Sequence, residues 1–114
     1  MGGYYAGDFS SNEDIEREFG LGASDLDGCD ILFAAYEYED YEGSAFVVFR
    51  KDGRLWSVDA GHCSCHGLDE QGYSGDGKTQ WEPEATTVKA LRMREFYSLG
   101  HHKAALLAAI GASA

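Results

Sequence analysis

The clearest pattern of apolar and polar positions lies between residues 44 and 59, where two apolar runs are joined by Asp52-Gly53. An Asp-Gly pair favours a type I′ hairpin turn, because both central residues of that turn need a positive φ. A two-residue turn also fixes the register of the two strands. The pairs expected on the core face are Phe49 with Trp56 and Val47 with Val58, and those on the half-apolar face are Arg50 with Leu55, Val48 with Ser57 and Phe46 with Asp59.

A third strand is predicted directly before this hairpin. Residues 31–38 form a continuous apolar run that becomes polar towards its end, and the acidic residues 39–43 predict a turn. Together with strands at 44–51 and 54–59, this run predicts a three-stranded antiparallel meander.

A short helix is predicted to begin after Ser11. Ser11 and Asp14 have the spacing of a capping box, and the acids in the first turn suit the positive end of the helix dipole. Ile15 and Phe19 lie four residues apart and form one apolar stripe, and Gly20 is expected to end the helix.

Two helical segments are predicted in the last third of the chain. Pro83, in the stretch Trp81-Glu82-Pro83-Glu84, suits the first turn of a helix that is expected to run to about Leu99. Residues 102–110 are rich in Ala and Leu and predict a last helix, either separate or continuous through Gly100. The residues that the first of these helices is expected to bury are Val88, Leu91, Phe96 and Leu99.

The remaining segments carry no periodic pattern. Residues 1–9 are rich in Gly and Tyr and are expected to be irregular, residues 67–80 predict a long loop, and residues 111–114 are expected to fray. We therefore predict one α+β domain across residues 1–114. It consists of a three-stranded antiparallel β-meander packed with two to three helices, which cover one face of the sheet.

The net charge of −11 is distributed unevenly along the chain. Residues 1–43 hold twelve acids and one base, Arg17, whereas residues 44–114 hold eight acids and eight bases. A surface of this sign repels nucleic acid and anionic membranes and attracts basic protein surfaces. The alternative interpretation is that the excess of acids only keeps a small protein soluble.

Several of these acids are interleaved with tyrosines, which supply contact area at low entropic cost and are typical of interaction surfaces. A half-buried edge strand whose charges prevent aggregation is the alternative. The residues that we predict to bind a partner are Glu13, Asp14, Glu16, Glu37, Tyr38, Glu39, Asp40, Tyr41 and Glu42.

The densest candidate chemistry is the sequence His62-Cys63-Ser64-Cys65-His66. His and Cys are good zinc ligands, but structural zinc sites draw their ligands as pairs from separate segments, so this cluster would need a distant partner, for which Cys29 is the best candidate. A thiol nucleophile activated by His62 or His66 is a further alternative, although such groups normally come from distant segments. The third interpretation is a structural corner of small buried thiols. We expect no cofactor, with zinc as the alternative.

The chain shows no apolar run near the roughly 20 residues that span a bilayer, and its first residues lack the pattern of a signal peptide. Three cysteines are too few and odd in number for a secreted disulfide framework. These features predict a cytoplasmic protein.

The segment from Glu42 to Leu68, with its Gly-His-Cys-Ser-Cys element, and the later Gln80-Trp81-Glu82-Pro83 resemble a group of small phage and prophage proteins. The resemblance covers about residues 42–91, omits the acidic N-terminal region and carries no catalytic residues over. It implies a phage origin, and small acidic phage proteins often inhibit bacterial defence, as anti-CRISPR proteins do, some by mimicking nucleic acid. We therefore expect a non-enzymatic inhibitor that binds a basic surface of a host protein, such as a nucleic-acid-binding defence complex.

Overall fold

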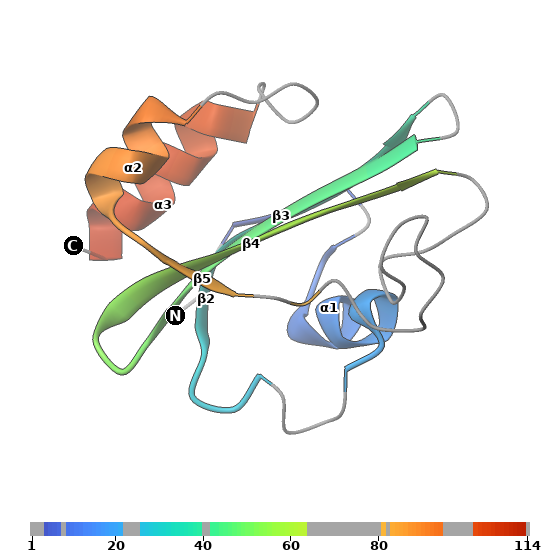
Figure 1. Ribbon diagram of the computed structural model, residues 1–114, viewed down its shortest axis with the longest axis horizontal. Helices are drawn as coiled ribbons and strands as arrows, with labels where there is room; N and C mark the ends of the chain where they lie inside the picture. Colours follow the sequence, from blue (N-terminus) through green and yellow to red (C-terminus); the bar gives the residue numbers. More distant parts are fainter. Residues whose placement is uncertain are drawn as a thin grey trace.

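The computed structural model describes residues 4–7, 9–21, 26–39, 42–63, 81, 83–94 and 102–113. Within these residues the fold is α+β, with a mixed five-stranded sheet in the order β1-β2-β3-β4-β5 (Figure 1). β1 is parallel to β2, and the other neighbouring strands are antiparallel. The strands are β1 (Tyr4–Gly7), β2 (Asp30–Glu39), β3 (Glu42–Lys51), β4 (Arg54–Cys63) and β5 (Glu84–Thr86), and the helices are α1 (Asn12–Phe19), α2 (Val88–Met93) and α3 (Lys103–Ser113).

The hairpin of β3 and β4 confirms the register expected from the Asp-Gly turn. Phe49 lies opposite Trp56 and Val47 opposite Val58. Asp52 and Gly53 both have positive φ, at 54° and 77°, as a type I′ turn requires. The predicted meander is therefore present as β2-β3-β4, and each of its strands is longer than the sequence pattern indicated.

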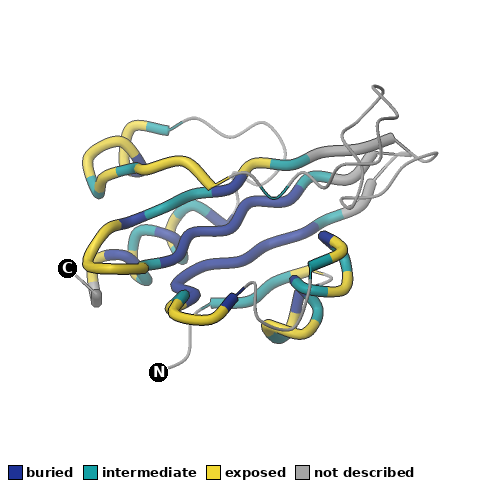
Figure 2. Tube along the Cα trace, turned by 60° about the horizontal axis from the view of Figure 1, so that its bottom comes forward, coloured by how far each residue is buried: buried dark blue, intermediate teal, exposed yellow. Residues whose placement is uncertain are grey.

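The two faces of the sheet are both covered, so the prediction that helices cover one face is wrong. Alternate residues of β3 point into two separate apolar clusters, and both clusters are buried. α1 lies over one face, whereas α2 and α3 lie over the other (Figures 1 and 2). We call these the α1 face and the α3 face. The second face needs a cover because Leu32, Phe33 and Ala35 of β2 add apolar surface to the half-apolar face predicted for the hairpin.

β2 contains an irregularity that decides which way its later side chains point. Ile31 pairs with Phe49 and Phe33 pairs with Val48, so Leu32 is an extra residue in the ladder. Leu32 and Phe33 consequently both belong to the α3 face, and the alternation after them is shifted by one position. Tyr36 lies on the α1 face as a result.

The N-terminal segment is a strand, which corrects the expectation of irregular structure over residues 1–9. β1 pairs with β2 along its whole length, and the Tyr4 ring stacks on Phe33 with ring centres 5.5 Å apart. Phe9, two residues after the end of the strand, is 1% exposed. Local composition misses this element because a parallel edge strand forms only where its neighbour already exists.

The predicted helix over residues 81–99 is also corrected. Glu84–Thr86 pair with β4 as the edge strand β5, and α2 begins only after Thr87, whose Oγ1 accepts a hydrogen bond from the Ala90 amide at 3.0 Å. α2 ends at Met93, and Phe96 and Leu99 lie outside the described residues. The last helix is confirmed as α3, which extends through Gly111 to Ser113 where fraying was expected.

Gly7 is the position at which the packing of β1 against β2 is tightest. Its φ is +66°, and a Cβ added there would lie 1.9 Å from the backbone oxygen of Tyr36. We expect Gly7→Ala to lower the free energy of unfolding by more than about 2 kcal/mol, measured by urea denaturation.

Gly53→Ala is the matched control for Gly7→Ala. Gly53 also has a positive φ, +77°, but a Cβ there meets nothing within 4 Å. The control therefore isolates conformational strain, which costs about 1–2 kcal/mol. Equal destabilisation by the two variants would contradict the close approach at Gly7.

Candidate interaction surface

α1 holds its position through two buried side chains and two well-defined ends. Ile15 and Phe19 are 0% exposed and pack on the α1 face of the sheet. Ser11 is the N-cap, and Gly20 ends the helix in the left-handed conformation, with its N–H donating to the Arg17 carbonyl. Both ends were predicted from the sequence, and both are confirmed.

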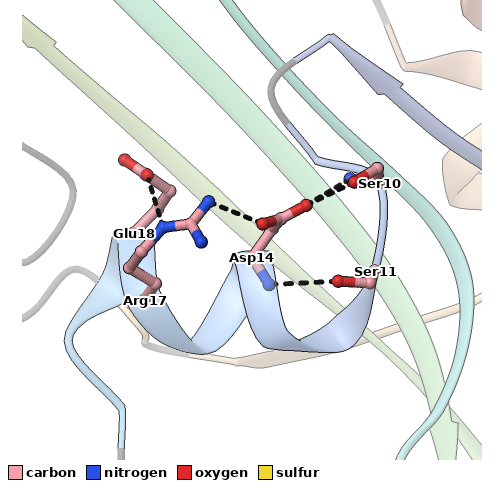
Figure 3. A network of polar contacts seen from close by, with 5 residues as sticks. All are labelled: Ser10, Ser11, Asp14, Arg17 and Glu18. Carbon is pink, nitrogen blue, oxygen red and sulfur yellow. Dashed lines mark hydrogen bonds and ion pairs between the residues drawn. The ribbon is translucent and has the colours of Figure 1, made fainter.

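Asp14 forms hydrogen bonds and an ion pair that stabilise the N-terminus of α1 (Figure 3). Its carboxylate accepts hydrogen bonds from the backbone N–H and the hydroxyl of Ser10, at 2.9 and 2.6 Å, and an ion pair joins it to Arg17 at 2.6 Å. The Ser11 hydroxyl accepts from the Asp14 amide at 3.4 Å. The hydrogen bonds from Ser10, followed by the nearby Arg17, hold the pKa of Asp14 below its ordinary value.

The other acids of α1 lie on its outer side. Glu13 is exposed and Glu16 is partly exposed. Glu18 forms an ion pair with Arg17 at 3.4 Å (Figure 3). We call Glu13, Glu16 and Glu18 the acidic face of α1.

The helix on the opposite side of the sheet has the opposite charge. α2 carries two bases, Lys89 and Arg92, both exposed, and no acid. Arg94, directly after α2, lies 4.1 Å above the Phe46 ring and forms an ion pair with Asp59. The described part of the molecule therefore has an acidic α1 side and a basic α2 side.

Glu37 lies on the α3 face, away from the acidic face of α1. The shift of alternation at Leu32 turns its side chain towards α3, where the carboxylate pairs with His102 Nε2. His102 is 9% exposed, and its Nδ1 lies 3.0 Å from the Tyr4 hydroxyl. One chain of polar contacts thus joins β1, β2 and the start of α3.

The polar contacts among Tyr4, His102 and Glu37 are typical of a structural role more than of a catalytic one. Both ring nitrogens of His102 are engaged by protein groups, and aromatic rings of Tyr4 and Phe33 pack against the imidazole at 5.8 and 6.4 Å. A general base needs a nitrogen that can reach a substrate proton. The role of His102 leaves no local pattern in the sequence, because its partners lie 65 and 98 residues away.

The other predicted partner-binding residues are only partly covered by the structure. The backbones of Tyr38 and Glu39 end β2, and Glu42 begins β3, where it pairs with Cys63. Their side chains, and Asp40 and Tyr41 altogether, lie outside the described residues.

The candidate zinc ligands are separated by the sheet. Cys29 immediately precedes Asp30, which pairs with Arg50, whereas Cys63 pairs with Glu42 at the far end of β3. Eight residues of strand correspond to about 27 Å, and a zinc–sulfur bond is about 2.3 Å long, so Cys29 and Cys63 cannot share one ion. The side chains of His62 and Cys63, and all of Cys65 and His66, lie outside the described residues, so a site formed by these four stays a prediction.

Within the described residues, no group of three or more His, Cys, Asp or Glu side chains could hold a metal ion. Over the same residues, no helix is long and apolar enough to cross a membrane. Comparison with protein-family models, with curated proteins and with solved structures found no match for this chain.

We expect Asp14→Asn to lower the free energy of unfolding at neutral pH. Because the folded-state pKa of Asp14 is lowered, its contribution is present above the unfolded value of about 4 and is lost as the pH falls through the folded value. Urea unfolding at several pH values should therefore show the difference between wild type and variant shrinking below about pH 4. Glu13→Gln, which removes the same charge from the same turn, is the control, and an equal profile for both variants would contradict the role of Ser10.

We expect Glu37 and His102 to be energetically coupled. Removing Glu37 alone leaves a buried imidazole nitrogen without that carboxylate, which costs about 1–3 kcal/mol. A double-mutant cycle of Glu37→Ala and His102→Ala, measured by urea denaturation, should give a coupling energy of about 1 kcal/mol or more. The control cycle pairs Glu16→Ala with His102→Ala, and additivity in both cycles would disprove the coupling.

Proposed function

We propose that the protein is a non-enzymatic binding protein that associates with a basic surface of a host protein through the acidic face of α1. The observation that carries this proposal is the separation of charge across the sheet. Glu13, Glu16 and Glu18 lie on one outer side, and the exposed bases Lys89 and Arg92 lie on the other. A polarised molecule of this kind orients itself as it approaches a basic partner.

The density of charge along α1 supports competition with a nucleic acid. α1 carries four acids and one base between residues 13 and 18, a net charge of −3. Six residues of helix are about 9 Å long, which gives one net charge per roughly 3 Å, close to the 3.4 Å between phosphates along one DNA strand. The match extends over about three phosphates only, so other acidic segments would contribute to a larger interface.

The mode of action that we propose is inhibition of a nucleic-acid-binding defence complex in a bacterial host, as anti-CRISPR proteins inhibit theirs. The resemblance of residues 42–91 to small phage proteins supports this choice of partner. The acidic face would occupy the site at which the partner holds nucleic acid, and binding would weaken as salt screens the charges.

The proposal predicts that neutralising two acids of α1 weakens partner binding more than neutralising two acids elsewhere in the chain. Glu13→Gln/Glu16→Gln and Asp52→Asn/Glu84→Gln each remove two exposed or partly exposed acids and change the net charge from −11 to −9. We expect affinity purification from bacterial lysate, followed by mass spectrometry, to recover the partner with wild type and with the Asp52/Glu84 variant. The Glu13/Glu16 variant should recover at least about fivefold less, because charge pairs at an interface contribute on the order of 1 kcal/mol or more.

The recovered partner also tests the mode of inhibition. Its nucleic-acid binding, measured by mobility shift, should fall when wild-type protein is added and should recover at higher salt. Equal recovery of the partner by both double variants would contradict binding through α1. Undiminished nucleic-acid binding would contradict inhibition at that site.

A further inference from the structure

A cavity of about 310 Å³ lies on the α1 face, at the end of the sheet that holds the β3–β4 turn. This volume is at the lower limit of the pockets that bind small molecules. The start of β2, the hairpin and the segment before β5 together form the cavity, so residues that are distant in sequence meet there. It is lined by Cys29, Phe49, Lys51, Trp56, Trp81 and Pro83.

The aromatic walls are held in place by contacts with one another and with α1. The Trp81 ring stacks on Phe49 with centres 5.7 Å apart and planes 12° apart, and it meets Phe19 of α1 edge-on at 5.1 Å. The Trp56 indole N–H donates to the Lys51 backbone oxygen at 3.4 Å. The polar edge of Trp56 is therefore occupied, and flat apolar ring surface is what the two indoles offer.

Among the described residues that line the cavity, the polar groups are the Lys51 ammonium and the Cys29 thiol. Partial burial raises the pKa of Cys29, and the charges of Asp27 and Asp52 act in the same direction while Lys51 opposes them. The thiol is therefore neutral at physiological pH, and Lys51 is the charged residue of the lining. A cationic ligand would meet a like charge at Lys51, whereas an anionic group placed there would form an ion pair.

We propose that this cavity binds a small planar aromatic carboxylate. The ring packs against the apolar ring surfaces of Trp56 and Trp81, and the carboxylate pairs with the Lys51 ammonium at the exposed rim. Flat walls favour a flat ligand, and the Lys51 cation selects the carboxylate over a neutral or cationic analogue. This site is independent of the acidic face of α1, and each can fail without the other.

The two tryptophans in the lining are the only two in the chain, so intrinsic fluorescence reports directly on the cavity. Benzoate and its neutral counterpart benzamide are the probes, titrated into the full-length protein up to about 10 mM because ligands of this size bind weakly. We expect benzoate to change the fluorescence at a concentration roughly threefold to fivefold lower than benzamide does, as for a partly exposed ion pair.

Lys51→Gln should abolish this preference while leaving the fold intact, because Lys51 is exposed. Lys89→Gln removes the same charge from α2, on the opposite face, and should keep the preference. A preference that persists in Lys51→Gln, equal responses to the two probes in wild type, or no response to either would overturn the proposal.

Alkylation of Cys29 gives a second readout that does not depend on fluorescence. In a Cys63→Ser/Cys65→Ser background, iodoacetamide reacts with Cys29 alone, because these are the three cysteines of the chain. We expect benzoate to slow this reaction at least about twofold, and Lys51→Gln to remove the protection. Unchanged alkylation at a benzoate concentration that changes the fluorescence would overturn binding in this cavity.

Discussion

Burial of β3 on both of its faces is the constraint on which the rest of the fold depends. Ala45 to Phe49 are each at most 3% exposed, so the middle of this strand has no side that water can reach. A strand of this kind must have neighbours on both edges and covers on both faces. α1 and α2 contain only eight and six residues, too few to be stable alone, and they persist because the sheet offers them apolar surface.

The parts of the fold that could be predicted are those specified by neighbouring residues. The type I′ turn needs only Asp52 and Gly53, and the two-residue loop then sets every pair of the hairpin. The ends of α1 follow in the same way from Ser11 and Gly20. β1 and β5 are different, because each is an edge strand whose ladder is completed by a neighbour elsewhere in the chain. Pro83 predicts a helix start, whereas the three residues after it, which end in the β-branched Thr86, continue an extended chain, and Thr87 then caps α2.

The negative charge of the candidate surface could be predicted from the sequence, but not all of the residues that form it. Asp14 and Glu37 belong to the acidic half of the sequence, yet Asp14 accepts hydrogen bonds from Ser10 and Glu37 pairs with the buried His102. The side chains of Asp14 and Glu37 are 14% and 22% exposed. A count of acids therefore overstates the charge that a partner meets, because a carboxylate that holds the fold together is already satisfied. The partner of Glu37 could not be found from the sequence, since 65 residues separate it from His102.

The extra residue in β2 has a consequence for which surface an acid serves. Leu32 divides the strand into two segments whose side chains alternate out of phase between the α1 face and the α3 face. If the same residues paired with β3 in a regular ladder, every side chain after Leu32 would lie on the opposite face. Glu37 would then face α1 instead of α3, which would add one carboxylate to the acidic side and leave His102 without that partner. A slip of one residue in the register of β2 thus exchanges internal support for interaction surface, although no residue changes.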